Sequence, residues 1–259
     1  MSEEPEVRRG VARTLLERFS RGIVLKRYLP KDLGSAPVLV SPDACLANWK
    51  WQVQSDLFDF AHEFVQPGNV VWDIGANVGL FSIAAAQRAG RLGEVVAVEA
   101  DIWLADLLRK SAKMQTADSA PIRVLPVAVA DSMGIAEFNI AQRGRCSNCL
   151  SVVGEHRLAG GARDTVSAIT VTLDWLLDMG IAAPDVLKID VEGAQDRVFS
   201  AVERVIVQSH PVILCEANSS QLVTDVLLRY GYTLFDWDTN PRVQTSRASM
   251  NTLAIPPAN

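Results

Sequence analysis

The sequence lacks an excess of basic residues, a long apolar run and a rich supply of cysteine. Its 259 residues carry a formal net charge of −5, whereas chains that bind nucleic acid normally present a basic surface. No uninterrupted apolar run approaches the roughly 18 residues of a membrane span. The N-terminus is charged and has no signal-peptide core. We therefore expect a soluble, cytoplasmic protein with no nucleic-acid partner and no stable membrane insertion.

The four cysteines are too scattered for a structural zinc site. Cys146 and Cys149 form one C-x-x-C pair, but no second Cys or His pair stands at the spacing that zinc requires. The pair also does not open a helix after a strand, as a thioredoxin-like motif does. We expect two loop thiols and no bound metal.

The first 50 residues predict an N-terminal helical extension, and residues 51–259 predict the main domain. Apolar residues at four-residue spacing from Val7 to Ile23 indicate one or two amphipathic helices over residues 1–30. The opposite face is rich in arginine. We expect that face to be solvated, and contact with a membrane surface or an acidic partner is the alternative.

Strands and helices alternate five times between Asn69 and Gly231. This order predicts an α/β domain with a mostly parallel sheet and helices on both faces. Ligands of such sheets bind at the carboxyl ends of the strands. A polar, irregular stretch from Ser132 to Ser167 interrupts the alternation, with residues 134–141 extended inside it, and two more extended runs close the chain.

The turn after the first strand lacks the dinucleotide-binding pattern. G-x-G-x-x-G counted from Gly75 needs glycine at positions 77 and 80, which hold Asn77 and Leu80. This difference argues against NAD or FAD. The pattern present, D-x-G-x-N-x-G from Asp73 to Gly79, suits a ligand without phosphates, such as S-adenosylmethionine.

The residues of this turn each have a predicted part in binding that cofactor. We expect Asp73 to attract the ammonium group of the methionine end, directly or through water. Gly75 and Gly79 should admit the methionine backbone, because glycine lets a ligand approach the main chain closely. Asn77 tolerates the left-handed conformation that such turns need.

The next two strands predict the rest of the cofactor site. Glu99 ends the second strand and can accept both ribose hydroxyls. The third strand, expected at residues 122–131, should flank the adenine with its end, around Val127, Ala128 and Asp131.

The fourth strand carries the candidates for catalysis. Lys188 and Asp190 share one face of it, and a buried lysine needs a carboxylate partner, either Glu216 or Asp190 itself. We expect Asp190 to orient or deprotonate a methyl acceptor, with Glu192 on the adjoining turn. The alternative is that Lys188 and the acids form an ion pair that only fixes the strand ends, and that Glu192 is a first-turn acid. No dense acidic cluster supports a divalent metal at Asp190 and Glu216.

Two further groups of residues suggest an acceptor site. The stretch from Gln142 to Arg163 is a polar mixture that includes Arg145 and Asn148 and suits a hydroxylated or anionic acceptor. Trp49, Trp51 and Trp237 predict an apolar or sugar-stacking wall, and the alternative for Trp49 and Trp51 is that they fasten the N-terminal segment to the core.

Five motifs in order give the chain a resemblance to a known family. They are PGNVVWDIGANVGLFS, GEVVAVEAD, VAVADSMG, LDWLLDMG and VLKIDVEGAQDRVFSA. Together, within Phe64 to Ile255, they resemble the FkbM family of S-adenosylmethionine-dependent methyltransferases. Two departures are visible: Ala100 stands where the family usually has proline, and Gln195 where glutamate is common.

The resemblance implies a class I methyltransferase core, Rossmann-like, with seven strands of which the last is antiparallel. It also implies methyl transfer, mostly to oxygen, in natural-product or glycan biosynthesis. The acceptor would then be a small hydroxylated molecule or a sugar. Two alternatives stay open at this point: an N-methyltransferase, and a non-catalytic cofactor-binding subunit that acts with a partner.

Overall fold

The computed structural model describes residues 19, 21–45, 55–154 and 160–258. At their centre is a large mixed sheet. The sheet has eight strands in the order β13-β12-β14-β11-β10-β3-β4-β5. In that order they span Val243–Thr245, Thr233–Asp236, Asn251–Ile255, Val212–Glu216, Val186–Ile189, Val70–Ile74, Glu94–Val98 and Ile122–Leu125. The five strands from β11 to β5 are parallel to one another.

The strand count expected from the resemblance is wrong by one. The last strand of the chain, β14, runs antiparallel to both of its neighbours, β11 and β12. Beyond them, β13 pairs with β12 at the edge of the sheet and makes the eighth strand. The added strand lies at the far edge from β3 and β4, so it does not alter the centre of the sheet.

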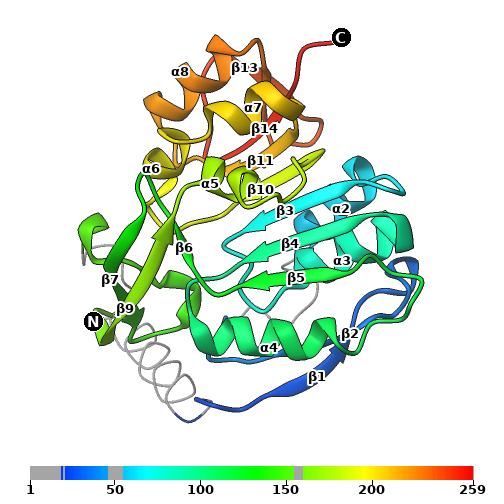
Figure 1. Cartoon of the computed structure of the whole chain (residues 1–259), viewed down its shortest axis with the longest axis vertical. Helices are drawn as coiled ribbons and strands as arrows, with labels where there is room; N and C mark the ends of the chain where they lie inside the picture. Colours follow the sequence, from blue (N-terminus) through cyan, green and yellow to red (C-terminus); the bar gives the residue numbers. More distant parts are fainter. Residues whose placement is uncertain (1–18, 20, 46–54, 155–159, 259) are drawn as a thin grey trace, which may run out of the picture.

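Helices cover both faces of the sheet (Figure 1). One face packs on α2 (Ser55–Phe64), α3 (Leu80–Ala89) and α4 (Ile102–Ala112), and the other on α5 (Leu173–Asp178), α6 (Gln195–Phe199), α7 (Glu203–Ser209) and α8 (Gln221–Arg229). The strand period of two explains the division, because Val71 belongs to the first core and Trp72 and Ile74 to the second. Single-turn 3₁₀ helices lie at Lys31–Leu33, Gly90–Leu92, Arg145–Ser147 and Ser151–Val153.

A second sheet occupies most of the stretch that the sequence predicts as irregular. Its order is β6-β9-β7-β8, with bounds Ala128–Val129, Ala162–Val171, Gly134–Ala141 and Cys149–Leu150. β7 matches the extended run expected at residues 134–141, but β9 is a strand where an irregular chain was expected. The two form a long antiparallel pair, from Gly134 opposite Thr170 to Ala141 opposite Ala162, and such pairing between distant residues is not visible as local periodicity.

The second sheet stands at the carboxyl ends of the central strands. Figure 1 shows β7 and β9 beyond the arrowheads of β3, β4 and β5. The single third strand expected at residues 122–131 is wrong, because the chain leaves the large sheet after Leu125 and pairs again only at β6. Pro126 lies at the break and has no backbone N–H to donate to a ladder.

The described part of the predicted N-terminal helical extension is a hairpin. β1 (Leu25–Tyr28) pairs antiparallel with β2 (Pro37–Val40), so a helix through residue 30 is wrong. Val38 and Val40 are buried against the first core, and the Leu39 amide donates to Ser111 of α4 over 2.9 Å. Contacts with α4 and the pairing with β2 outweigh the helical spacing of the local sequence. The rest of that prediction, together with Trp49 and Trp51, lies outside the described residues.

No helix among these residues is both long and apolar enough to cross a lipid bilayer.

Candidate active site

The carboxyl ends of the central strands and the second sheet enclose a cavity of about 260 Å³. The strand order reverses between β3 and β10, because β4 and β5 follow β3 on one side and β10 and β11 lie on the other. Ligands of doubly wound sheets bind at such a switch point. The lining combines one apolar wall with four carboxyl groups, those of Glu99, Asp190, Glu192 and Glu216.

The turn after β3 is shaped by contacts within the protein. Gly75 has φ of +76°, and a Cβ on it would lie 1.9 Å from the backbone oxygen of Asp190. Gly79 has φ of +87°, and its Cβ would lie 2.0 Å from Cδ1 of Leu108 on α4. Both positions therefore need glycine for chain packing, and only Gly75 lines the cavity. Asn77 does adopt the left-handed conformation, with φ of +52°, and its Oδ1 accepts from the Val78 amide over 2.7 Å.

Asp73 lies beneath the cavity. Its side chain is fully buried, and its carboxylate accepts from Ser82 Oγ at 2.5 Å and from Lys188 Nζ at 3.1 Å. It is not among the residues that line the cavity. The structure therefore brings Asp73 to Lys188, where it supports the floor of the site.

Glu99 lies on the cavity with both carboxylate oxygens already oriented. Oε2 accepts from the Asn77 amide over 2.7 Å and Oε1 from the Asp101 amide over 2.8 Å. Burial raises the pKa of Glu99 to about 7, against the opposing effect of these two hydrogen bonds. A carboxylate has about four lone-pair positions, so two held amides leave room for further donors from a ligand.

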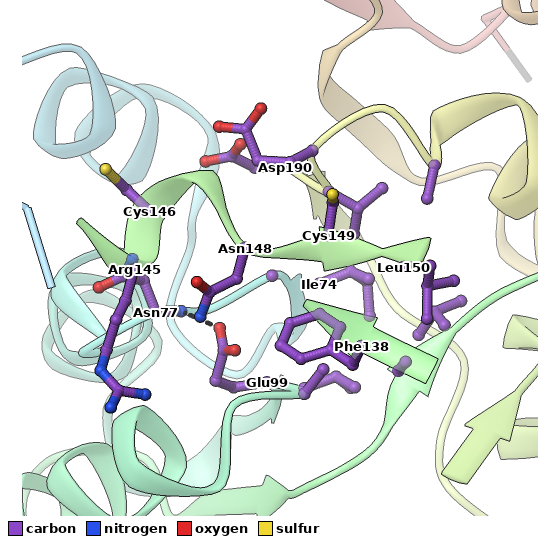
Figure 2. A pocket seen from close by; sticks show the side chains of 18 of the residues that line it. Ile74, Asn77, Glu99, Phe138, Arg145, Cys146, Asn148, Cys149, Leu150 and Asp190 are labelled. Carbon is purple, nitrogen blue, oxygen red and sulfur yellow. Dashed lines mark hydrogen bonds between the residues drawn. The ribbon is translucent and has the colours of Figure 1, made fainter. Parts of the chain in front are cut away.

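Of the residues predicted to flank the adenine, some line the cavity and one does not. Val127, Ala128 and Val129 line the cavity, facing Phe138 and Leu150 of the second sheet. Asp131 does not line it, because its carboxylate receives two bonds from Arg197 Nη1, of 2.8 and 2.9 Å, at the surface. In Figure 2, Phe138 lies beside the strand end that carries Glu99.

Lys188 makes three contacts under the floor of the cavity. Its ammonium group lies 3.1 Å from Asp73 Oδ1, 3.1 Å from the backbone oxygen of Gly75 and 3.4 Å from Asp190 Oδ2. Burial alone would lower the pKa of Lys188, but the charges of Asp73 and Asp190 raise it above its ordinary value. Of the two predicted partners of Lys188, Asp190 forms the ion pair and Glu216 does not. The second partner, Asp73, was not predicted. The register of β10 and β3 could have indicated it, because Lys188 sits opposite Asp73 on the neighbouring strand.

Asp190, Glu192 and Glu216 gather at one end of the cavity. Figure 2 shows Asp190 and Glu99 on opposite sides of it in this view. Burial alone would raise the pKa of Asp190, but the charge of Lys188 and a hydrogen bond with Glu216 lower it below the ordinary range. Burial, that hydrogen bond and the charges of Asp190 and Glu192 raise the pKa of Glu216 to about 8.

Residues 145–150 form a wall that an ion network fixes in place. Arg145 bonds to Asp101 and, through Nε at 3.1 Å, to Asp43, while Asn148 donates to Asp101 over 2.7 Å. Arg163 makes two bonds of 3.0 Å to Asp43. Arg145 and Asn148 line the cavity, but their nitrogen atoms donate to these acids, and Asn148 Oδ1 accepts from the Ala141 amide over 2.8 Å. The sequence analysis did not identify Asp43 or Asp101 as partners of this wall. Asp101 also caps the start of α4, where its side chain accepts from the Trp103 and Leu104 amides.

The remaining predicted residues lie elsewhere or act within the protein. Cys146 lines the cavity, and its thiol interacts with the thiol of Cys45 by a hydrogen bond. Cys149 is buried, and neither Cys146 nor Cys149 forms a disulfide. No cluster in the described part of the chain has three or more side chains suited to a metal. Trp237 packs against Phe60 of α2, with ring centroids 5.7 Å apart, and does not line the cavity.

These features fit a nucleoside that carries a positive charge. The apolar wall suits a purine ring, the oriented Glu99 carboxylate suits vicinal hydroxyls, and the acidic end suits a cation. S-adenosylmethionine combines these three chemical features. The residues that would hold it are Glu99 and Asn77 at the ribose, Ala128 and Phe138 at the base, and Asp190 near the sulfonium.

Comparisons with known proteins agree with this chemistry. The model of the methyltransferase FkbM domain matches residues 73–234. No curated protein matches the chain.

Several solved structures are similar to the chain. An FkbM methyltransferase from Methylobacillus flagellatus KT is 13% identical over 96% of this chain and 59% of its own, with a TM-score of 0.46. Precorrin-6y C5,15-methyltransferase from Geobacter metallireducens GS-15 is 16% identical over 78% of this chain and 86% of its own, with a TM-score of 0.43. Aeropyrum pernix fibrillarin, with natively bound S-adenosyl-L-methionine, is 13% identical over 79% of this chain and 74% of its own, with a TM-score of 0.44. Structural similarity at these TM-scores and sequence identities carries no information about the substrate.

The matched range covers more than half of the chain and includes the turn after β3, Glu99 and the acidic end of the cavity. The chain belongs to the FkbM family of S-adenosylmethionine-dependent methyltransferases.

Proposed function

We propose that this protein transfers the methyl group of S-adenosylmethionine to a hydroxyl oxygen of a small molecule, such as a natural product or a sugar. The observation that carries the proposal is the pair of carboxyl groups of Asp190 and Glu216, which lie at the adjacent ends of β10 and β11 and line one end of the cavity. When bound, S-adenosylmethionine supplies an electrophilic methyl carbon on a positively charged sulfur.

The chain's own residues would then bind and orient the two reactants. Glu99 holds the ribose hydroxyls, and the wall of residues 145–150 limits the access of water. Placing an acceptor oxygen against the methyl carbon supplies much of the acceleration of such a displacement.

The acid pair favours a hydroxyl over an amine as acceptor. An aliphatic hydroxyl attacks poorly until a neighbouring base takes or shares its proton, whereas an unprotonated amine needs no such help. Asp190 is close to the cation Lys188, and Glu216 and Glu192 line the same end of the cavity, so carboxyl groups surround the place where that proton would leave.

Calorimetric titration tests the cofactor part of the proposal. We expect S-adenosylmethionine to bind wild type with micromolar affinity and NAD to give no heat. Glu99→Gln should weaken binding at least tenfold, because its amide nitrogen would face a backbone N–H that now donates to a carboxylate. The matched control is Glu137→Gln, an exposed position on β7, which should bind as wild type does.

Transfer of a labelled methyl group tests the acceptor part. The purified protein is incubated with methyl-labelled S-adenosylmethionine and two panels of small molecules, one of alcohols and sugars and one of primary and secondary amines. We expect label in the hydroxylated panel. Label in the amines alone, with full activity retained by Asp190→Asn, would refute O-methylation while leaving the cofactor assignment intact.

A further inference from the structure

Asp190 and Glu216 are neighbours across two central strands. β10 and β11 are parallel, with Ile189 opposite Cys215, so the next positions, Asp190 and Glu216, lie side by side at the strand ends. Both line the same cavity, so two carboxyl groups meet at adjacent strand ends. Two carboxyl groups held this close resist joint ionisation, so one of them retains a proton.

The surrounding charges decide which carboxyl group holds that proton. Lys188 Nζ lies 3.4 Å from Asp190 Oδ2, and no ion pair joins Glu216 to a lysine or arginine within the described ranges. Glu192, on the turn after β10, adds a second negative charge near Glu216. Asp190 is therefore the ionised member and Glu216 the protonated one.

Within the part of the chain that the structure describes, the remaining contacts of Glu216 with other elements are neutral. Asn218 Nδ2 lies 3.3 Å from Glu216 Oε1, a neutral contact. From β14, Asn251 is the register partner of Glu216, and its amide donates to Asp238 over 2.9 Å. The protonation of Glu216 is thus controlled by Asp190, Glu192 and whatever charge occupies the cavity.

The turn after β11 fixes the position of Glu216. Asn218 and Ser219 have φ of +48° and +57°, two consecutive left-handed residues that are not glycine. Two amides, those of Ala217 and Asn218, donate to the backbone oxygen of Met250 over 2.8 and 3.1 Å and hold this conformation. Such strained backbone gathers at functional sites, where it pre-organises a side chain.

We propose that Glu216 is the proton acceptor of the reaction: it shares one proton with Asp190 in the free protein, releases it to solvent when the sulfonium cation occupies the cavity, and then takes the proton of the acceptor hydroxyl. The proposal rests on the proposed function. The hydroxyl proton passes to Glu216 as the oxygen–carbon bond forms and the carbon–sulfur bond breaks, and the sulfur keeps the bonding electron pair as a neutral thioether.

This division of roles follows from the two environments. Asp190 is stabilised as an anion by Lys188 and is by itself too weak a base for a hydroxyl. Its fixed negative charge raises the proton affinity of Glu216, because two like charges in contact resist joint ionisation. A base whose proton affinity lies near the operating pH is the most effective one.

Proton release on binding can be measured without knowing the acceptor. S-adenosylmethionine and S-adenosylhomocysteine share every titrating group but differ in the charge on sulfur. Each is titrated calorimetrically at pH 7 in phosphate and in Tris, two buffers of very different ionisation enthalpy, with EDTA present to remove metal ions. We expect wild type to release up to one proton more with S-adenosylmethionine than with S-adenosylhomocysteine. Any proton that Glu99 releases on contact with the ribose is common to both ligands and cancels in this difference.

Glu216→Gln should release equal numbers of protons with the two ligands, and Glu137→Gln should show the same difference between them as wild type. Equal proton numbers for the two ligands in wild type, or a difference retained in Glu216→Gln, would overturn the proposal while the cofactor assignment stands. If S-adenosylmethionine does not bind to wild type at all, the proposed function and this inference fail together.

Discussion

At the scale of single residues, the structure gives a different physical role to several residues of the D-x-G-x-N-x-G motif. The sequence predicts that Gly75 and Gly79 admit a ligand, whereas the atoms nearest to their missing Cβ belong to Asp190 and Leu108. Asp73 likewise supports Lys188 from below. The motif therefore builds the floor of the site, and of its predicted binding residues Gly75 and Asn77 line the cavity while Asp73 and Gly79 do not.

The role of Gly75 in packing against the Asp190 carbonyl can be tested in the absence of any ligand. Gly75→Ala should lower the free energy of unfolding by about 2–5 kcal/mol, combining the cost of a left-handed alanine with a clash against the Asp190 carbonyl. Gly68→Ala is the control, because Gly68 has φ of +89° but no atom within 4 Å of its added Cβ. It should cost about 1–2 kcal/mol. Equal losses of stability in urea denaturation would show that position 75 needs glycine for its backbone conformation alone and not for its closeness to the Asp190 carbonyl.

At the scale of elements, the wall of the cavity depends on an ion network between distant segments. Asp43, just after β2, holds Arg145 and Arg163, and Asp101 at the start of α4 holds Arg145 and Asn148. The backbone adds to this contact, because the amides of Arg145 and Cys146 donate to the oxygens of Asp43 and Ala44, both over 2.8 Å. The N-terminal hairpin thereby positions a wall of the cofactor cavity.

Removing the charge of Asp43 should loosen that wall. Asp43→Asn leaves two partly buried arginines, Arg145 and Arg163, with a neutral partner, and breaking a fully buried pair costs about 3–5 kcal/mol, which is an upper bound here. We expect faster hydrogen exchange at the amides of Arg145 and Cys146 and weaker binding of S-adenosylmethionine. Asp164→Asn, at an exposed neighbour of Arg163, is the matched control and should change neither. Unchanged exchange in Asp43→Asn would mean that the backbone bonds alone hold the segment.

At the scale of the whole molecule, the site makes the fold sensitive to pH. Glu99 and Glu216 have pKa values raised to about 7 and about 8, against 4.5 for a free glutamate. Between pH 4.5 and these values the unfolded chain has lost protons that the folded chain still binds, so stability falls as the pH rises. The stabilising effect of protonation is complete below pH 4.5 and is lost by about pH 8.

Chemical denaturation across this range measures the effect. We expect the free energy of unfolding of the ligand-free protein to decline from pH 5 to pH 8, and we expect Glu216→Gln to flatten the decline, since glutamine does not titrate. The exposed substitution Glu137→Gln should leave the slope as in wild type. A wild-type stability that rises with pH over this interval would contradict the protonated state of Glu216.

Much of the fold was predictable because its signals are local. Apolar strands alternate with helices whose caps can be read directly, as where Asp101 accepts from the Trp103 and Leu104 amides at the start of α4. The second sheet and the β1–β2 hairpin were not predictable in this way. β9 is polar and largely exposed, and both the sheet and the hairpin are stabilised by pairing between strands that short local patterns do not reveal.

The sequence by itself determined the family, the cofactor and the edge of the sheet where the site lies, because a motif of glycine and acids at successive strand ends is a local pattern. Only the tertiary structure decided which of these residues meet. It placed Asp73 against Lys188 and Glu216 against Asp190, and it moved Asp131 away to Arg197. The physical reason is that ion pairs and shared protons depend on distances between strands, which the register of the folded sheet sets and the order of residues along one strand does not.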